Sequence, residues 1–181
     1  CFKREKVFTK VKDVVKSESD YNFMADLLFL PESKEYKYCL TVVDLYTDEF
    51  DIEPIKNKEP KTVLEAMIKM FKRPYLNKPY ASIKTGGGTE FKGVFHKWLY
   101  DNSILHRTSL PARHSQVSNV ESLNRQLGRL FNGYMNAQEL KTGKQSKDWI
   151  SLVPAVRTEL NNYRKERNDK LLKNYKKPEL D

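Results

Sequence analysis

The first third of the chain contains three apolar runs whose length and spacing predict β-strands. Residues 21–30 are almost uninterruptedly apolar and end at Pro31, a pattern typical of a strand buried on both faces. Residues 36–46 are rich in Tyr, Val, Leu and Thr, and a shorter run covers residues 50–55. Because only a short polar turn separates the first two runs, we expect an antiparallel hairpin extended by a third strand.

Helical spacing of apolar residues begins after a charged loop at residues 56–61. Thr62 followed by Glu65 has the form of a capping box, so we expect a first helix to begin there and to end before Pro74. A short strand over residues 80–85 then leads into a glycine-rich turn.

The remaining elements are two short ones and two long helices. Apolar positions predict a helix over residues 91–99 and a strand over residues 104–107. A long helix capped by Ser118 or Asn119 follows, and a last helix carries the apolar positions between residues 149 and 163. From residue 164 onward the composition is mostly charged, which predicts a frayed tail.

This order of elements predicts an α/β fold with a mixed sheet, made of three antiparallel strands and then alternating helix and strand, flanked by helices. At 181 residues the chain has the size of one domain. We expect a basic lead-in over residues 1–19, a core over residues 20–165 and a charged tail over residues 166–181. Because the chain begins with Cys1 rather than Met, we also expect it to be a piece of a longer protein.

The chain carries a net charge of +9, from 33 Lys and Arg residues against 24 Asp and Glu residues. Such an excess favours a polyanionic partner, above all nucleic acid. No apolar run approaches the length of a membrane span and no apolar signal-like segment opens the chain, so we expect no membrane partner and an intracellular location. The two cysteines form no metal pair or disulfide framework, and Cys39 is expected to be a small buried apolar residue.

Two aspartates stand inside apolar strands and are therefore candidates for chemistry. Asp26 and Asp44 have the same profile, and a buried carboxylate is costly unless it is paired, metal-bound or protonated. Phosphoryl transfer in DNA requires neutralisation of charge on the attacking and leaving oxygens, which two Mg²⁺ ions held by carboxylates supply. Periodicity does not rank Asp26 above Asp44, and backbone donors or a Lys could satisfy either of them.

Three segments, taken in order, carry a more specific signal. Residues 21–46 place an aromatic residue before an Asp-Leu strand and continue with Tyr-x-Leu-Thr-Val-Val-Asp. Residues 86–91 read Gly-Gly-Gly-Thr-Glu-Phe, and residues 120–125 read Val-Glu-Ser-Leu-Asn-Arg. Position 86 and Glu121 are 35 residues apart.

Together these segments resemble the retroviral-integrase family of the DDE transposase and integrase superfamily, whose second and third acidic positions have a similar separation. The resemblance covers residues 20–165, and within the superfamily the chain looks closest to integrases of Polinton/Maverick-like or related viral mobile elements. The resemblance implies a ribonuclease-H-like fold. It also implies DNA 3′-end cleavage by water followed by strand transfer, without a covalent protein intermediate.

By this resemblance Asp26 and Glu121 are catalytic metal ligands in a site for two Mg²⁺ or Mn²⁺ ions. Gly86 occupies the position of the family's second aspartate and has no side chain to offer. Three interpretations follow: a substitution that removes activity, which we favour; compensation by Glu90; or a shifted register. To compensate, Glu90 would have to bend back across the glycine turn.

A basic surface is expected beside these carboxylates. Arg125 and Arg129 lie four and eight residues after Glu121 and so share its helix face. Residues 104–147 contain seven basic and two acidic residues, a field that attracts a phosphate backbone in a salt-dependent way. The alternative is that these arginines are ordinary solvated charges.

The loop before the long helix resembles the mobile active-site loop of integrases, whereas His96 and His106 lack ligand spacing and are expected to be structural. The residues that we predict to contact DNA are Arg113, His114, Gln116, Asn124, Arg125, Arg129 and Lys144.

We therefore expect the catalytic core of an integrase or transposase that acts on double-stranded DNA, at element ends and at the target, as a homo-oligomer. No small-molecule substrate is expected, and the location would be nuclear or virion-associated. Two alternatives stay open: a catalytically dead DNA-binding or assembly module with the same fold, and a metal-dependent nuclease without strand transfer.

Overall fold

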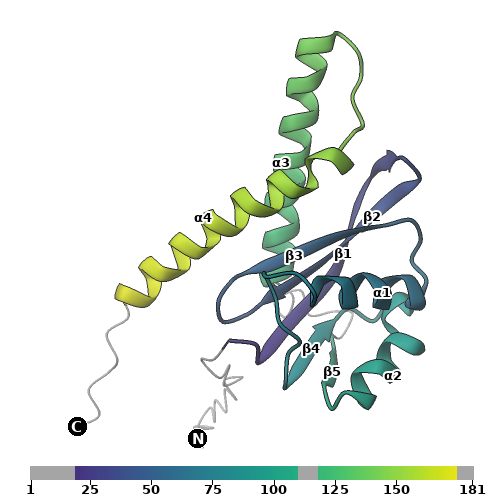
Figure 1. Cartoon of the computed structure of the whole chain (residues 1–181), viewed down its shortest axis with the longest axis vertical. Helices are drawn as coiled ribbons and strands as arrows, with labels where there is room; N and C mark the ends of the chain where they lie inside the picture. Colours follow the sequence, from purple (N-terminus) through teal and green to yellow (C-terminus); the bar gives the residue numbers. More distant parts are fainter. Residues whose placement is uncertain (1–18, 110–117, 175–181) are drawn as a thin grey trace, which may run out of the picture.

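One mixed β-sheet lies between two layers of helices in the computed structural model, which describes residues 19–109 and 118–174 (Figure 1). The strands are β1 (Asn22–Ser33), β2 (Tyr36–Asp44), β3 (Phe50–Ile55), β4 (Ser82–Thr85) and β5 (Leu105–Thr108). Strands β1 to β3 form an antiparallel meander, whereas β4 pairs in parallel with β1 and β5 pairs in parallel with β4, giving the order β3-β2-β1-β4-β5. The predicted hairpin and its third strand are confirmed.

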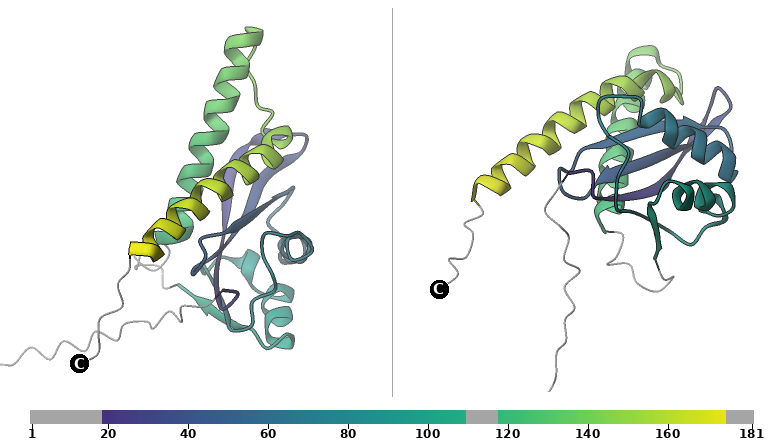
Figure 2. Two further views of the ribbon diagram at one scale, coloured as in Figure 1. Left: turned by 60° about the vertical axis from the view of Figure 1, so that its left-hand side comes forward. Right: turned by 60° about the horizontal axis from the view of Figure 1, so that its bottom comes forward.

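Helices cover both faces of this sheet. The helical elements are α1 (Pro60–Met70), the 3₁₀ turn η1 (Thr89–Phe91), α2 (Val94–Asp101), α3 (Ser118–Thr142), the 3₁₀ turn η3 (Ile150–Leu152) and α4 (Val153–Asn174). Helices α1 and α2 pack on one face, and α3 and α4 pack on the other (Figure 2).

Strand β1 supplies alternate side chains to two separate hydrophobic clusters. Phe23, Ala25 and Leu27 belong to the cluster beneath α1 and α2. Met24 belongs to the cluster beneath α3 and α4, which also contains the fully buried Trp149. This part of the strand is therefore buried on both faces, as predicted. Asp26, two residues after Met24, lies on the face covered by α3.

The first helix begins earlier than the sequence predicts. Glu59 is the N-cap residue and Pro60 opens the helix, so the capping box predicted at Thr62 is wrong. Proline suits the first helical position because its fixed φ is already helical and its missing N–H has no partner to lose there. The predicted helix over residues 91–99 is also split, because Gly93 adopts a φ of 56° between η1 and α2.

Helix α4 extends through much of the expected tail, so the prediction of fraying from residue 164 is wrong as far as Asn174. Its polar residues bind the main chain of β3, which is an edge strand of the sheet. Asn161 accepts a 2.9 Å hydrogen bond from the Phe50 N–H and donates one of 2.9 Å to the Phe50 carbonyl, as a neighbouring strand would. Arg157 donates to the carbonyl of Ile52. These contacts cover an edge that would otherwise be open to another chain.

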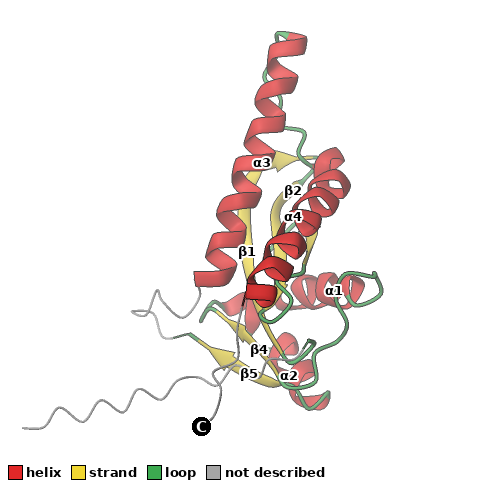
Figure 3. Cartoon of the chain, turned by 90° about the vertical axis from the view of Figure 1, so that its left-hand side faces the viewer, coloured by secondary structure: helices red, strands yellow, loops and turns green. Residues whose placement is uncertain are grey.

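The long helix α3 runs beside β1 and continues beyond the sheet (Figure 3). At its far end the side chain of Leu140 is 89% exposed. Among residues 19–109 and 118–174, no helix is long and apolar enough to cross a membrane. Cys39 is buried and unpaired, as predicted, and burial raises the pKa of its thiol.

Candidate active site at the sheet edge

Asp26 lies on β1, and Gly86 directly follows β4, the parallel strand beside it. The register pairs Met24 of β1 with Lys84 of β4, and Asp26 and Gly86 each follow two residues later. Because side chains alternate along a strand, position 86 lies next to Asp26 and on the same face of the sheet. Position 86 is thus close to Asp26, and that both are metal-ligand positions stays a prediction.

The carboxylate of Asp26 is bound by α3. The Nδ2 group of Asn124 donates a 3.1 Å hydrogen bond to Oδ2 of Asp26. The Oδ1 atom of Asn124 accepts a 2.9 Å hydrogen bond from the hydroxyl of Thr41. The Asn124 carboxamide, which we predicted to contact DNA, is thus turned toward Asp26 and Thr41, and its contact with DNA stays a prediction.

Three carboxylates share this edge of the sheet. The pKa of Asp26 is raised, chiefly because burial disfavours its charged form, and the negative charges of Glu90 and Glu121 raise it further. Glu121 reaches the site from the first turn of α3, three residues before Asn124. The structure therefore brings Asp26 and Glu121, the two predicted ligands, within electrostatic reach of each other.

The glycine turn determines where Glu90 lies. Its carboxylate folds back over Gly88, so closely that a Cβ atom at position 88 would collide with it. The carboxylate of Glu90 thus bends back as far as Gly88, and its compensation for Gly86 stays a prediction. At Gly86, by contrast, an added Cβ would meet no heavy atom within 4 Å. The position where the motif predicts an aspartate has room for a side chain.

A chain of hydrogen bonds runs from the surface to the carbonyl of Gly86. The Thr85 hydroxyl donates to that carbonyl at 2.9 Å and lies 2.7 Å from Nε2 of His106, whose Nδ1 lies 2.8 Å from Nδ1 of His96. The Thr85 hydroxyl donates its one proton to the Gly86 carbonyl, so Nε2 of His106 donates to the hydroxyl oxygen. Nδ1 of His106 then accepts from Nδ1 of His96. Burial and the neighbouring His96 lower the pKa of His106, which favours this neutral form. Both histidines thus have contacts of the structural kind that we expected.

The structure separates Asp44 from Asp26. Asp44 is 2% exposed at the end of β2, and its carboxylate accepts hydrogen bonds from the backbone N–H groups of Asp20, Tyr46 and Thr47. It therefore stabilises the turn that follows the strand. Sequence periodicity could not make this distinction, because both aspartates interrupt apolar runs in the same way.

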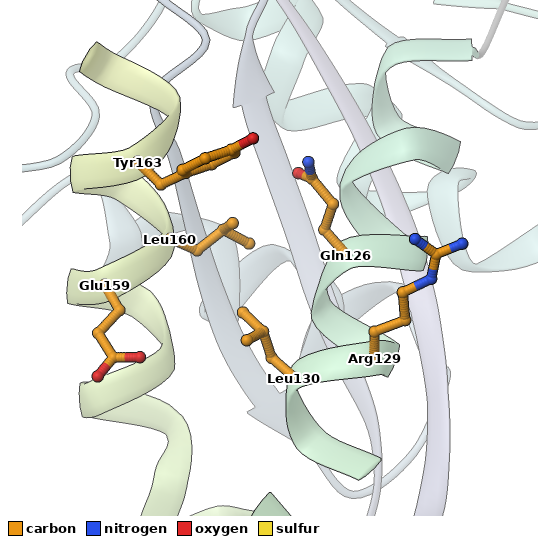
Figure 4. A pocket seen from close by; sticks show the side chains of 6 residues that line it. All are labelled: Gln126, Arg129, Leu130, Glu159, Leu160 and Tyr163. Carbon is orange, nitrogen blue, oxygen red and sulfur yellow. The ribbon is translucent and has the colours of Figure 1, made fainter. Parts of the chain in front are cut away.

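Only some of the predicted DNA contacts fall within the described residues. Arg125, Arg129 and Lys144 are all exposed. In Figure 4 the guanidinium group of Arg129 points away from α4. Arg113, His114 and Gln116 lie outside the described residues.

A separate cavity of about 370 Å³ lies between α3 and α4. Leu160 and Tyr163 of α4 point toward Gln126 and Leu130 of α3 across it (Figure 4). Neither Asp26 nor Glu121 lines this cavity, so it is distinct from the carboxylate site.

The residues present do not complete a metal site. Within residues 19–109 and 118–174, no three His, Cys, Asp or Glu side chains are placed to hold one metal ion. Asp26 and Glu121 are of the hard oxygen type that Mg²⁺ and Mn²⁺ prefer, but the third donor of the motif is absent at Gly86. The chain therefore has part of the donor set that the sequence motif implies.

The mixed sheet with helices on both faces defines a ribonuclease-H-like fold, as predicted. No protein-family model matches the chain, and no curated protein matches it. Among solved structures, the HTLV-2 integrase catalytic core domain in complex with magnesium, in its dimeric form, is similar with a TM-score of 0.58 and 19% identity over 77% of this chain and 84% of that chain. The trimeric form gives a TM-score of 0.53 and 18% identity over 81% and 82% of the two chains.

A third similar structure is the simian T-cell lymphotropic virus intasome in complex with the PP2A regulatory subunit B56 gamma. Its TM-score is 0.63, with 16% identity over 76% of this chain and 47% of that chain. At such low identity these similarities show the fold. Kinship with Polinton/Maverick-like integrases stays a prediction.

Sequence reasoning missed Thr41, which contacts both Asn124 and the main chain of Asp26. The available signal was weak: Thr41 is the one hydroxyl residue in the apolar run from Cys39 to Val43. A threonine is common in strands, so its type alone indicates no particular role.

Replacing Asp26 with Asn should stabilise the fold at neutral pH. Because the pKa of Asp26 is raised in the folded state, stability is lost as pH rises from the pKa of the unfolded chain to that of the fold, and the loss is complete at neutral pH. An asparagine side chain at this position would be neutral and could still accept from Asn124, so we expect the free energy of unfolding to rise by about 0.5–2 kcal/mol. Urea unfolding at pH 7 measures this gain, which should disappear at acid pH, where Asp26 is itself protonated.

Asp44→Asn is the matched control for this substitution. An amide nitrogen would replace one of two oxygens that accept backbone N–H groups, so a loss of about 1–3 kcal/mol is expected. A loss of stability in Asp26→Asn as large as that in the control would contradict the interpretation of Asp26.

Proposed function

We propose that this chain is the core domain of an integrase-type protein for DNA 3′-end cleavage and strand transfer, whose metal site is one carboxylate short. The observation that carries the proposal is the convergence of Asp26, position 86 and Glu121 at one sheet edge. The order of these positions along the chain is that of the motif, and similarity to HTLV-2 integrase cores supports the same class.

In the proposed function, Asp26 and Glu121 belong to the divalent-metal site of the class. The similar HTLV-2 cores are complexes with magnesium, which supports Mg²⁺ or Mn²⁺ as the ion. Gly86 leaves the donor set incomplete, so we infer that the chain as written binds DNA but transfers no strand. The role of its own residues is then to hold the DNA backbone beside an unfinished site.

The face of α3 that carries Glu121 supports DNA as the partner. Arg125 and Arg129 are exposed on successive turns of this helix, and Lys144 is exposed just after its end. Side chains four residues apart on a helix lie above one another, so the two arginines form a basic row that starts at the carboxylate site. We propose that this row binds the phosphate backbone of double-stranded DNA.

Arg125→Ala and Arg129→Ala should each weaken binding of double-stranded DNA. If each side chain neutralises one phosphate, each substitution lowers the slope of log affinity against log salt concentration by about one. Fluorescence anisotropy with a labelled duplex over a series of salt concentrations measures both the affinity and the slope.

Lys72→Ala is the charge-matched control, because Lys72 is exposed next to α1 on the opposite face of the sheet. We expect its affinity and slope to equal those of the unchanged chain. Equal effects of all three substitutions would show that net charge, rather than the face of α3, determines binding.

Activity assays distinguish the proposed function from two alternatives, a catalytically dead DNA-binding module and a nuclease. A dead DNA-binding or assembly module would stay inactive after Asp is placed at position 86. A nuclease would nick DNA but would not join a pre-cut DNA end to a target. Compensation by Glu90 is supported by its folded-back carboxylate, and it predicts metal-dependent strand transfer by the chain as written.

We also propose that the protein acts as a homo-oligomer, which is supported by the dimeric and trimeric forms of the similar HTLV-2 core. A nuclear or virion-associated location stays a prediction.

A further inference from the structure

Thr41 lies directly opposite Asp26 in the sheet. The antiparallel register of β1 and β2 pairs these two residues, so their side chains lie on the same face, beneath α3. On either side of Thr41 along this face are Cys39 and Val43, both members of the apolar cluster that α3 and α4 cover. Thr41 is therefore a hydroxyl in an otherwise apolar row.

The hydroxyl of Thr41 is fully buried, with 0% of the residue exposed. Burying a hydroxyl is unfavourable unless it makes hydrogen bonds, and valine would fill nearly the same space without that cost. The position thus uses a polar side chain where packing alone requires an apolar one. The role of the hydroxyl must therefore lie in the groups that it contacts.

Thr41 contacts two groups of the candidate site. Its Oγ1 atom lies 2.9 Å from Oδ1 of Asn124 and 3.1 Å from the main-chain carbonyl of Asp26. Both of these oxygens only accept, so the hydroxyl is the donor, and its single proton is shared between them with the shorter contact to Asn124. Asn124 then presents its Nδ2 group to the carboxylate of Asp26, at 3.1 Å.

Thr41, Asn124 and Asp26 form a closed ring of contacts. Thr41 binds Asn124, Asn124 binds Asp26, and Asp26 pairs with Thr41 across β1 and β2. An asparagine amide can turn about its last bond and present either its oxygen or its nitrogen. With Thr41 donating to the oxygen, the nitrogen end of Asn124 faces Asp26. Without that donor, the amide oxygen of Asn124 loses its partner and the amide is free to rotate away.

We propose that Thr41 is a positioning residue, which acts through Asn124 to hold the Asp26 carboxylate in the orientation that the DNA reaction uses. This inference rests on the proposed function for the meaning of that orientation, although the arrangement itself does not depend on it. Thr41 does not touch the DNA in this proposal. Its effect reaches the reaction only through Asn124 and Asp26.

Two substitutions separate the hydroxyl of Thr41 from its packing. Thr41→Val keeps the shape and removes the donor, whereas Thr41→Ser keeps the donor and removes a methyl group. In NMR spectra of the 181-residue chain, we expect the side-chain amide protons of Asn124 to exchange with solvent at least about tenfold faster in Thr41→Val. In Thr41→Ser the exchange rate should stay within about threefold of the unchanged chain.

The second measurement is strand transfer by the chain that carries Gly86→Asp. Thr41→Val should lower kcat for strand transfer about 10–100-fold without changing KM for DNA, and Thr41→Ser should restore most of it. Unchanged amide exchange in Thr41→Val would overturn the proposal. So would equal loss in both variants, which would assign the effect to packing. If strand transfer is absent even with Thr41 in place, the proposed function fails, and amide exchange alone still decides the role of Thr41.

Discussion

Gly86→Asp should complete a divalent-metal site beside Asp26. The new carboxylate would lie just after β4, the strand next to β1, and the structure has open space for it. Because oxygen-ligand number and charge determine the affinity of such sites, we expect Mn²⁺ to bind at least about tenfold more tightly than to the unchanged chain. Isothermal titration calorimetry or electron paramagnetic resonance measures the difference.

The matched control is Gly87→Asp, which adds the same charge one residue later. An added Cβ there meets only the side chain of Thr108 at 3.8 Å, so the substitution is also tolerated. Because that Cβ faces Thr108 of β5, whereas a Cβ at position 86 faces open space, the control carboxylate should lie toward β5 and miss the site. Equal Mn²⁺ affinity in the two variants would contradict the assignment of position 86.

Asp51→Ala should destabilise the fold strongly. Asp51 is 0% exposed on β3, and its carboxylate forms ion pairs of 2.8 Å with Arg73 and 2.7 Å with Arg157. Removing it leaves the largely buried guanidinium group of Arg157 without its ion-pair partner, whereas Arg73 keeps Glu53 at 2.6 Å. Removing one partner of a buried ion pair costs about 3–5 kcal/mol. Urea or thermal unfolding at neutral pH measures the change.

The exposed ion pair between Lys56 and Glu35 provides the comparison. These groups are 2.8 Å apart, but their side chains are 52% and 78% exposed. Such a pair contributes at most about 1 kcal/mol, so Lys56→Ala should change stability little. If Asp51→Ala were as mild as Lys56→Ala, the ion pair between Asp51 and Arg157 would not be holding α4 to the sheet.

The strands were predictable because their apolar runs are short, are bounded by turn residues and are therefore compatible with few structures other than buried strands. The start of α1 was not, because Pro60 and Thr62 both favour a helix start and only packing decides between them. Helix α4 was misjudged from its charge. Arg157 and Asn161 are polar residues that bind an edge strand far away in the sequence, and no local pattern contains that partner.

The motif predicted that Asp26 and Glu121 lie close together, as they do in the structure, and their role as metal ligands stays a prediction. The folded-back Glu90 was not predictable, because it depends on the conformation of a turn in which Gly88 leaves space for the carboxylate. Thr41 escaped notice because its role depends on the register between β1 and β2 and on the position of α3. Asp44 looked like a candidate ligand in the sequence but has a structural role, because its carboxylate accepts backbone N–H groups that come together only in the folded turn.

We propose that this fold is an integrase-type core in which position 86 lacks a metal ligand. The most direct test is the joining of a pre-cut DNA end to target DNA with Mn²⁺, using the chain with Gly86→Asp. We expect joined product from this variant, none from the unchanged chain, and none when Asp26→Asn is added. A Gly86→Asp protein that folds and binds DNA but joins no ends would contradict this proposal. Strong joining by the unchanged chain would also contradict it, because another residue, of which Glu90 is the first candidate, would then supply the ligand.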